Sequence, residues 1–218
     1  MSIKTAFVFA AGFGTRMGSL TRKTPKPLLD LHGRPMIDHC LELLIGAGVE
    51  RIYANTHYLP EQLEEHLAKK GVTTLREVEI LETGGGLKAA LSTIGTDPVI
   101  TMNPDVLWRG SNPVDSLLSA WRSDMRGLLM LTDAGRHDDD FSLEHGRIQR
   151  KGPLRYTGLQ IIRTDRLKDI PKTKFSLNEY WDLLLATGDL HGMVYDGKWV
   201  DIGTEEALAA VNAEGGDG

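Results

Sequence analysis

The sequence contains one cysteine and no long hydrophobic run, and both shortages exclude whole classes of protein. With Cys40 alone, the chain can form no internal disulfide and no cysteine-based metal site, which fits a reducing compartment. The six apolar residues at 6–11 fall below the ~7 to 15 of a signal-peptide core, and no later stretch approaches the ~20 apolar residues of a membrane helix. We therefore expect a cytoplasmic protein without a membrane segment.

Positive charge is also in short supply. The 25 lysines and arginines are outnumbered by 30 aspartates and glutamates, which gives a net charge of −5. This balance argues against a nucleic-acid-binding protein, because such proteins neutralise phosphates with an excess of cations. Several of the cations that are present form one local basic cluster near the N-terminus, at Arg16, Arg22, Lys23 and Lys26.

Strands and helices alternate along the first half of the chain. Buried strands are expected at 5–11, at 51–56, near 76–81 and at 98–103, and helices at 36–48, 60–71, 85–95 and 113–123. This alternation predicts an α/β fold with a Rossmann-like, mostly parallel mixed sheet and helices on both faces. A chain of 218 residues with 41% hydrophobic residues is expected to form one domain with a packed core.

The second half has a different pattern, typical of a small β-rich portion of the same domain. A polar loop at 133–142 precedes strands at 145–152 and 156–164 that look paired with each other. Residues 193–203 resemble a hairpin that turns at Asp196 and Gly197. A capping box at 176–179 is expected to open a helix that starts at 177, and Thr204 is expected to cap a last helix.

Residues 7–29, FVFAAGFGTRMGSLTRKTPKPLL, place glycines, cations and prolines directly after a buried strand. Glycines in this place let backbone N–H groups converge on phosphate, and Arg16 adds a planar fork of donors. Pro25 and Pro27 stiffen the backbone around Lys26, so that its ammonium is held at a fixed place. The prolines also disfavour a dinucleotide-binding dehydrogenase, whose helix would run through them at a cost of ~3 kcal/mol. The stretch therefore predicts a triphosphate site.

At these residues the sequence resembles the sugar-1-phosphate nucleotidyltransferases, whose pattern is GxGTR, a spacer and then PKP. The resemblance continues in the family's order through LETGGGLKAAL, MNPD, YTGLQI and WVDIGT, and so covers nearly the whole chain. Short members that act on N-acetylmuramate 1-phosphate share LETGGG and lack a C-terminal extension. The sequence departs from the pattern at Pro104, where members usually have glycine. Residues 150–153 are the only counterpart of an E-K-P element and lack its sugar-binding glutamate.

The resemblance implies that the phosphate of a sugar 1-phosphate attacks the α-phosphorus of a nucleoside triphosphate, here UTP, and releases pyrophosphate. It implies a nucleotide-binding part at about 1–110 and a sugar-binding part at about 111–218 within the one domain. Arg16 would hold the β- and γ-phosphates, and Lys26 would bridge the α-phosphate and the sugar phosphate. No general base is needed, because a phosphate monoester with a second pKa of ~6 is already an anion at neutral pH.

Asp105 and Asp201 are the expected ligands of Mg²⁺. Asp105 follows a buried strand, at the carboxyl edge of the sheet where open α/β folds bind ligands, and the resemblance pairs it with Asp201. Two carboxylates together with substrate phosphates and water suit Mg²⁺, which seldom uses an all-protein cage. A single aspartate is more often a turn or cap residue, as we expect for Asp97 and Asp115.

The remaining candidates lie in the same motifs. Glycines at 85 and 86 allow the backbone to approach a nucleotide base closely, and Glu82 can accept a hydrogen bond from an N–H group of that base. The expected nucleotide contacts are Ala11, Gly12, Gly14, Thr15, Glu82, Thr83, Gly85 and Gly86. The expected sugar or phosphate contacts are Asn103, Gly158, Lys151 and Lys174, of which the two lysines can equally be solvated surface residues.

Two alternatives stay open at this point. The same chemistry can serve glucose or mannose phosphate with UTP, dTTP or GTP, and a non-catalytic sensor of sugar nucleotides can keep the same fold. The joint presence of Arg16, Lys26, Asp105 and Asp201 speaks against the sensor. The sequence leaves the oligomeric state open.

Overall fold

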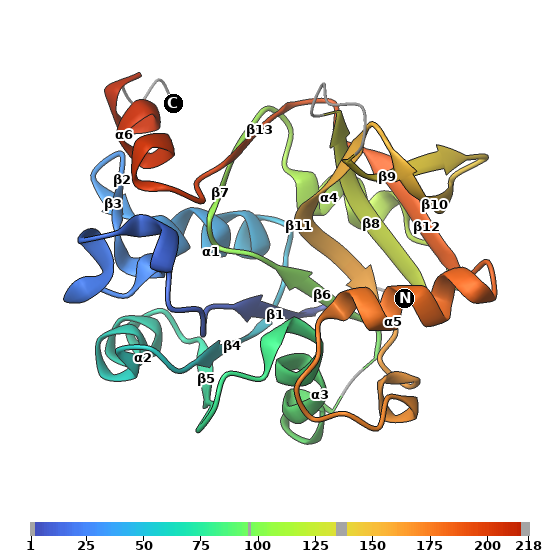
Figure 1. Cartoon of the computed structure of the whole chain (residues 1–218), viewed down its shortest axis with the longest axis horizontal. Helices are drawn as coiled ribbons and strands as arrows, with labels where there is room; N and C mark the ends of the chain where they lie inside the picture. Colours follow the sequence, from blue (N-terminus) through green and yellow to red (C-terminus); the bar gives the residue numbers. More distant parts are fainter. Residues whose placement is uncertain (1–2, 96, 134–138, 215–218) are drawn as a thin grey trace.

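The computed structural model describes residues 3–95, 97–133 and 139–214, and one nine-stranded sheet runs through it (Figure 1). Its strands are β1 (Thr5–Phe9), β4 (Arg51–Thr56), β5 (Thr73–Arg76), β6 (Val99–Met102), β8 (Gly127–Asp133), β9 (Asp139–Glu144), β10 (Arg147–Gly152), β11 (Leu154–Ile162) and β12 (Leu190–Val194). They lie in the order β5-β4-β1-β6-β11-β8-β12-β10-β9.

The sheet changes character along its width. The four strands β5, β4, β1 and β6 are parallel to one another, as in a Rossmann-like fold. Beyond β6 the sheet is mixed, because β11 is antiparallel to both β6 and β8, whereas β12 is parallel to β8. The central strands β1 and β6 are apolar on both faces and buried, which explains their continuous hydrophobic runs. The predicted α/β fold with a mixed sheet is confirmed.

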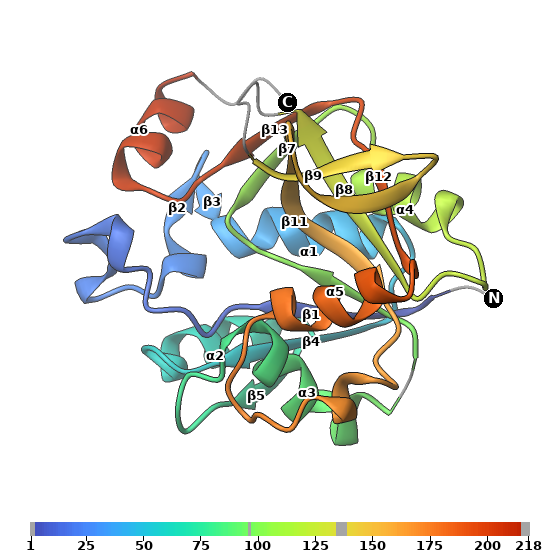
Figure 2. The same ribbon diagram turned by 45° about the vertical axis from the view of Figure 1, so that its right-hand side comes forward.

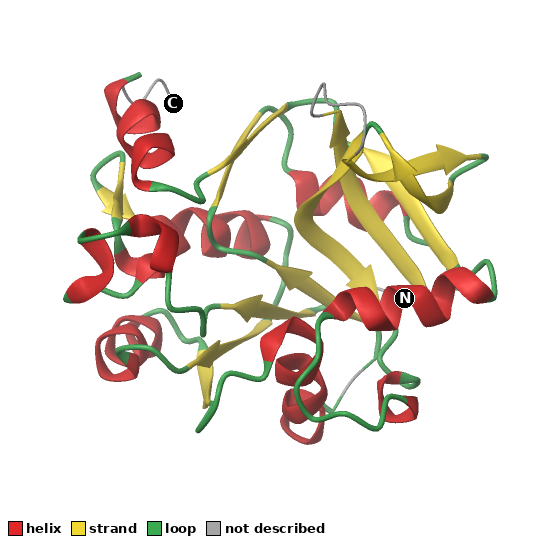
Figure 3. Cartoon of the chain, viewed as in Figure 1, coloured by secondary structure: helices red, strands yellow, loops and turns green. Residues whose placement is uncertain are grey.

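Helices cover both faces of the sheet (Figure 3). One face packs against α1 (Met36–Gly46), α2 (Pro60–Lys69) and α4 (Pro113–Ala120), and the other against α3 (Glu82–Ile94) and α5 (Leu177–Ala186). Side chains alternate between these faces along each strand: in β8, Leu128 and Met130 face the α1 side, and Leu129 and Leu131 face the α5 side.

A smaller unit lies beside the main sheet. It consists of the strand pair β7 (Val106–Arg109) and β13 (Lys198–Asp201), the short pair β2 (Asp30–Leu31) and β3 (Arg34–Pro35), and helix α6 (Glu205–Ala213). Figure 2 shows β7 and β13 side by side, with α6 next to β2 and β3. A third hydrophobic cluster, which includes Met17, Leu107, Ile202 and Leu208, holds this unit together. This cluster joins the segment after β1 to helix α6.

Four local predictions differ from the structure. The strand expected near 76–81 lies earlier, at 73–76, because the carboxylate of Glu77 accepts from Asn55 and from the N–H of Leu81 and so ends the strand. The expected hairpin at 196–197 is absent, since β12 pairs with β8 and β13 pairs with β7. Buried Tyr195 lies between them and donates its hydroxyl to the carbonyl of Ser111 (2.7 Å).

The expected pairing of 145–152 with 156–164 is also wrong, because β10 pairs with β9 and β12, whereas β11 pairs with β6, β8 and β9. Both cap residues are confirmed: Ser176 accepts from Asn178 N–H (3.2 Å) and Thr204 from Ala207 N–H (3.2 Å). The second half of the expected capping box is not formed, because the carboxylate of Glu179 accepts from Lys172 (2.8 Å). The polar loop expected at 133–142 is wrong at both ends, because 133 belongs to β8 and 139–142 belong to β9, and residues 134–138 lie outside the described residues. Within the described ranges, no helix is both long enough and apolar enough to cross a membrane.

Candidate active site

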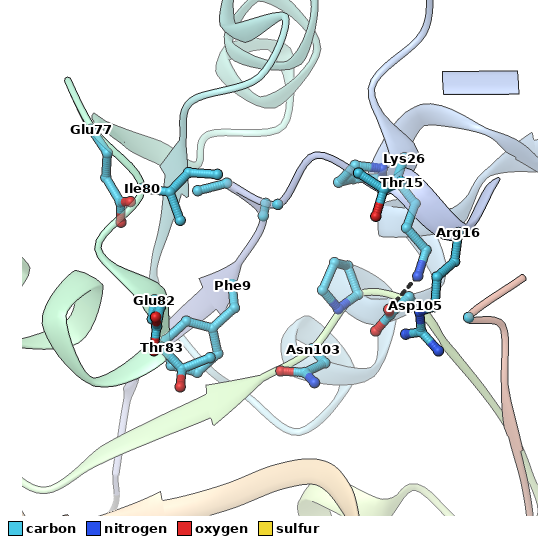
Figure 4. A pocket seen from close by; sticks show the side chains of 17 residues that line it. Phe9, Thr15, Arg16, Lys26, Glu77, Ile80, Glu82, Thr83, Asn103 and Asp105 are labelled. Atoms are coloured by element: carbon cyan, nitrogen blue, oxygen red, sulfur yellow. Dashed lines mark hydrogen bonds and ion pairs between the residues drawn. The ribbon is translucent and has the colours of Figure 1, made fainter. Parts of the chain in front are cut away.

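A cavity of ≈ 310 Å³ opens at the carboxyl ends of β1, β5 and β6. Parallel strands of an α/β sheet present their ligand sites at this edge. Figure 4 shows two groups of side chains around it. One end holds Phe9, Glu77, Ile80, Glu82 and Thr83; the other holds Thr15, Arg16, Lys26 and Asp105, with Asn103 between the groups. We call these the acidic end and the phosphate end.

The loop after β1 brings its glycines to the cavity in two different ways. Gly14 has φ +64° and precedes a 3₁₀ turn at Thr15–Met17, so its backbone lies in the left-handed region that favours glycine. A Cβ on Gly14 would also lie 2.8 Å from Cβ of Lys26. At Gly12 a Cβ would meet nothing within 4 Å and would occupy open space at the cavity. Gly14 is thus required by the loop itself, whereas Gly12 leaves the cavity free.

Lys26 is fixed at the phosphate end by its two prolines. It begins a 3₁₀ turn, Lys26–Leu28, that follows an extended Pro25. The residue is 9% exposed, and its ammonium donates to a carboxylate oxygen of Asp105, which lies 79 residues further along the chain. A buried ammonium next to open cavity space is available to a ligand with little loss of side-chain entropy.

Asp105 and Asp201 meet because of the strand register. Asp201, the last residue of β13, pairs with Val106, the residue after Asp105. The N–H of Ile202 also donates to the carbonyl of Asp105 (2.9 Å). Two acids from opposite parts of the chain are therefore adjacent in space.

The surroundings of Asp201 favour the protonated form of its carboxyl group. Burial, followed by the charge of Asp105, raises the pKa of the Asp201 carboxyl, although the cations of Lys26, Arg16 and Arg155 act in the opposite direction. Two neighbouring, partly buried carboxylates are a donor set that a divalent cation can hold together. Among the described residues, no three acidic, histidine or cysteine side chains converge. The pair suits an ion that takes its other ligands from phosphates and water.

Arg16 lies beside Lys26 and Asp105 at the same end of the cavity (Figure 4). It lies in the 3₁₀ turn after Gly14 and is exposed. Its guanidinium packs against Gly203, where a Cβ would lie 2.8 Å from Nη1 of Arg16. The chain segment that follows Asp201 thus supports the arginine, and both ends of the sequence contribute to the phosphate end.

The acidic end of the cavity contains a buried network. The N–H of Ala10 donates to Oδ1 of Asn55 (2.8 Å), whose amide donates to Glu77 (2.7 Å). Glu77 is 9% exposed and also accepts from the N–H of Leu81 (3.0 Å). Phe9 and Ile80 add apolar surface there. This end offers a flat apolar wall and carboxylate acceptors, which suits a base.

Of the four candidates at 82–86, only Glu82 and Thr83 line the cavity. Glu82 has a positive φ of 62°, and Thr83 accepts from the N–H of Leu177 through its hydroxyl. A Cβ on Gly85 would lie 2.2 Å from the carbonyl oxygen of Thr173, and one on Gly86 would lie 2.6 Å from Glu77. The two glycines therefore permit packing within the protein and do not line the cavity.

The candidates for sugar binding are divided in the same way. Gly158 has φ +89° and a Cβ there would lie 2.9 Å from Cβ of Asn103, whose N–H donates to the carbonyl of Gly158 (2.9 Å). Gly158 thus supports Asn103, which lines the cavity. Lys151 and Lys174 are exposed and do not line it.

The match to known proteins decides the family. Residues 6–201 match the family described as the MobA-like NTP transferase domain. The protein belongs to this family of nucleotidyltransferases. This transferase is 36% identical to the N-acetylmuramate alpha-1-phosphate uridylyltransferase of Caulobacter vibrioides over 96% of each chain. It is 30% identical to the mannose-1-phosphate guanyltransferase of Hypocrea jecorina over 90% of its own length and 60% of that protein.

A solved structure shares the fold of the transferase. HddC from Yersinia pseudotuberculosis, crystallised with GMP-PN, superposes with a TM-score of 0.78 at 24% identity, over 98% of this chain and 99% of that chain.

The sequence analysis did not predict four residues at the acidic end of the cavity, namely Phe9, Asn55, Glu77 and Ile80. The signal that could have found Asn55 and Glu77 is their place at the carboxyl ends of two parallel strands.

Proposed function

We propose that this transferase moves a uridylyl group from UTP to N-acetylmuramate 1-phosphate, with Mg²⁺ as its cofactor, and releases pyrophosphate. The contact of Lys26 with Asp105 beside Asp201, at one end of a cavity that a glycine loop borders, is the observation that carries the proposal. The relative from Caulobacter vibrioides, which matches over 96% of both chains, supports this substrate pair. The mannose-1-phosphate guanyltransferase of Hypocrea jecorina gives weaker support for a guanylyl donor with mannose 1-phosphate, because the match covers 60% of that protein.

The nucleotide would lie along the cavity, with its base at the acidic end and its phosphates at the other. Glu82 and Glu77 would present acceptors to base N–H groups, and Phe9 would contact the ring. The backbone at Ala11 and Gly12 would approach the phosphates, with the hydroxyl of Thr15 as a further donor. Arg16 would hold the β- and γ-phosphates.

In the reaction, an oxygen of the sugar phosphate forms a bond to the α-phosphorus, and the bond from that phosphorus to the bridging oxygen of the β-phosphate breaks. The oxygen leaves with pyrophosphate, so no covalent intermediate with the protein is required. Lys26 would neutralise the charge that develops on the α-phosphate oxygens. Asp105 and Asp201 would hold Mg²⁺, which when bound neutralises phosphate charge and orients both reactants.

The protein's contribution is mainly positioning. Lys26 is held by its prolines and by Asp105, so little reorganisation is needed when the phosphates arrive. Asn103, supported by Gly158, would contact the sugar next to the phosphate end. Lys151 and Lys174 stay predictions as phosphate contacts. Because UTP is the donor, we infer that the protein works in the cytoplasm.

The test is pyrophosphate release measured for every combination of UTP, dTTP and GTP with N-acetylmuramate, N-acetylglucosamine, glucose and mannose 1-phosphates. We expect the highest kcat/KM for UTP with N-acetylmuramate 1-phosphate, and no release when Mg²⁺ is chelated. A higher value for GTP with mannose 1-phosphate would contradict the substrate pair. No release with any combination would contradict the enzymatic function and favour a sensor.

A further inference from the structure

One arginine near the Asp105–Asp201 pair forms no ion pair with any residue that the structure describes. Arg155, in β11, is half-buried, and the described residues offer its guanidinium no hydrogen bond and no ion pair within 4 Å. Neighbouring arginines differ: Arg150 forms an ion pair with Asp182 (2.7 Å), and Arg163 with Asp97 (3.2 Å). A partly desolvated guanidinium without an anion is unfavourable unless a ligand supplies one.

Strand register shows which face Arg155 occupies. Arg155 pairs with Thr132 of β8, which has the same parity as Met130 and therefore faces the α1 side of the sheet. The next residue, Tyr156, faces the other side, where its ring lies 4.8 Å from that of Trp181. Arg155 is thus separated by the sheet from the aromatic cluster that α5 covers.

The same face of β11 is joined to the strand that carries Asp201. Trp199 of β13 donates its indole N–H to the carbonyl of Thr157 (3.0 Å), two residues after Arg155. Asp201 lies two residues after Trp199 and so projects from the same face of β13. Arg155 and Asp201 are near enough for their charges to interact, although they form no ion pair.

The location of Arg155 points to the acceptor and not to the nucleotide. It does not line the cavity in which the nucleotide would lie, yet Thr157 on the same strand accepts from Trp199, which lies two residues before Asp201. The proposed acceptor carries two anions: the phosphate, which Lys26 and the two aspartates would receive, and the carboxylate of its lactyl ether. A guanidinium fork matches a carboxylate in a bidentate manner.

We propose that Arg155 binds the lactyl carboxylate of the acceptor and selects N-acetylmuramate 1-phosphate over neutral sugar 1-phosphates. This inference rests on the proposed function, whose substrate pair it explains. Arg155 is therefore a specificity residue and takes no part in the bond changes at phosphorus.

The test compares two acceptors that differ only in the lactyl group, N-acetylmuramate 1-phosphate and N-acetylglucosamine 1-phosphate, each with saturating UTP. In Arg155→Met we expect kcat/KM to fall roughly 10- to 100-fold for the acidic acceptor, the range of a hydrogen bond to a charged group. For the neutral acceptor kcat/KM should change by less than about 3-fold. Arg155→Lys, which keeps the charge but loses the fork, should give an intermediate fall.

The matched control is Lys198→Met. Lys198 is an exposed cation on β13 that projects from the face opposite to Asp201, so its loss removes the same charge from the neighbourhood. It should leave the ratio of the two acceptors unchanged. Calorimetric titration with UDP-N-acetylmuramate and UDP-N-acetylglucosamine gives a readout without turnover, in which Arg155→Met should weaken only the first.

Two results would overturn the inference. An equal fall in kcat/KM for both acceptors in Arg155→Met would show that Arg155 contacts the shared phosphate, and an unchanged kcat/KM for each acceptor would show that it contacts neither anion. These results differ from failure of the proposed function, in which the parent protein would form no UDP-sugar from UTP. A parent protein that uridylylates only neutral acceptors would overturn both the substrate pair and the role of Arg155.

Discussion

The phosphate end of the cavity and the acceptor side are built in contrasting ways. One continuous segment, 11–26, contributes most of the phosphate end, and its glycines, cation and prolines follow one another in the sequence. The proposed acceptor side would combine Asn103, Arg155 and Asp201, which belong to three separate segments that strand pairing and the hydrogen bond from Trp199 to Thr157 bring near one another. A site concentrated in one segment can be predicted from its motif, whereas one assembled by register needs the sheet topology.

The largest expected effect concerns the two proposed metal ligands, Asp105 and Asp201, one from each region. Asp105→Asn and Asp201→Asn should each lower kcat by at least about 10³-fold, because each removes half of the proposed metal-binding pair. The measurement is pyrophosphate release at saturating UTP, acceptor and Mg²⁺. Asp115→Asn, an exposed acid in the first turn of α4, is the control and should retain the parent rate. A near-normal rate in either variant would remove that residue from the proposed metal site.

Lys26 tests the phosphate end alone. Lys26→Met keeps much of the buried side-chain volume but removes the ammonium, so kcat should fall roughly 10²- to 10³-fold while KM for UTP changes much less. Steady-state kinetics over a range of UTP concentrations gives both constants. If the loss were confined to KM, Lys26 would bind substrate without acting on the transition state.

The two glycines of the loop sharpen the comparison within this segment. Gly12→Val places its side chain in open cavity space, so it should weaken UTP binding at least ~10-fold while unfolding free energy stays within about 0.5 kcal/mol. Gly14→Val should cost about 1–2 kcal/mol for φ +64° alone, and more for its overlap with Lys26. Calorimetric titration with UTP and Mg²⁺ and thermal denaturation separate the two effects. A folded Gly12→Val variant that bound UTP as tightly as the parent would exclude the loop as the phosphate cradle.

The smallest effect concerns stability without metal. The raised pKa of Asp201, caused first by burial and then by Asp105, means that the folded state binds this proton more tightly than the unfolded state. The resulting stabilisation is complete below the unfolded pKa of ~3.9 and is lost as pH rises through the folded pKa. Above that range the carboxylate destabilises the fold.

Asp201→Asn should therefore raise Tm of the metal-free protein by roughly 1–4 °C at neutral pH, although it abolishes turnover. The difference should shrink as pH falls toward 4. Differential scanning calorimetry in a chelating buffer measures both trends, and a lower Tm at neutral pH would mean that the carboxylate stabilises the apoprotein.

The contrast also explains how much of the molecule could be predicted from the sequence. The strand and helix alternation of the first half and the caps at Ser176 and Thr204 are local signals, and the structure confirms them. The expected hairpin at 196–197 failed because a turn signal does not reveal that β12 pairs with β8 and β13 with β7. Sheet partners depend on contacts between distant segments.

In the candidate site, too, local motifs could be predicted, whereas contacts between distant segments could not. Of the four predicted catalytic residues, Arg16, Lys26 and Asp105 line one cavity, whereas Asp201 lies next to Asp105 without lining it. Their roles in the reaction stay predictions. Glu77 was missed because an acid in the charged stretch 76–79 resembles a surface residue until its contact with Asn55 is known. Gly85 and Gly86 resemble ligand contacts in the sequence but are required by packing.

The most direct measurement of the central claim follows the phosphorus atoms of UTP. The protein is incubated with N-acetylmuramate 1-phosphate, Mg²⁺ and UTP carrying a radioactive label on either the α- or the γ-phosphate. Attack at the α-phosphorus predicts that the α label appears in UDP-N-acetylmuramate and the γ label in pyrophosphate, in equal amounts. Release of the γ label as inorganic phosphate would contradict the account. So would an α label that stays in UTP with N-acetylmuramate 1-phosphate but is transferred in parallel incubations with other sugar 1-phosphates.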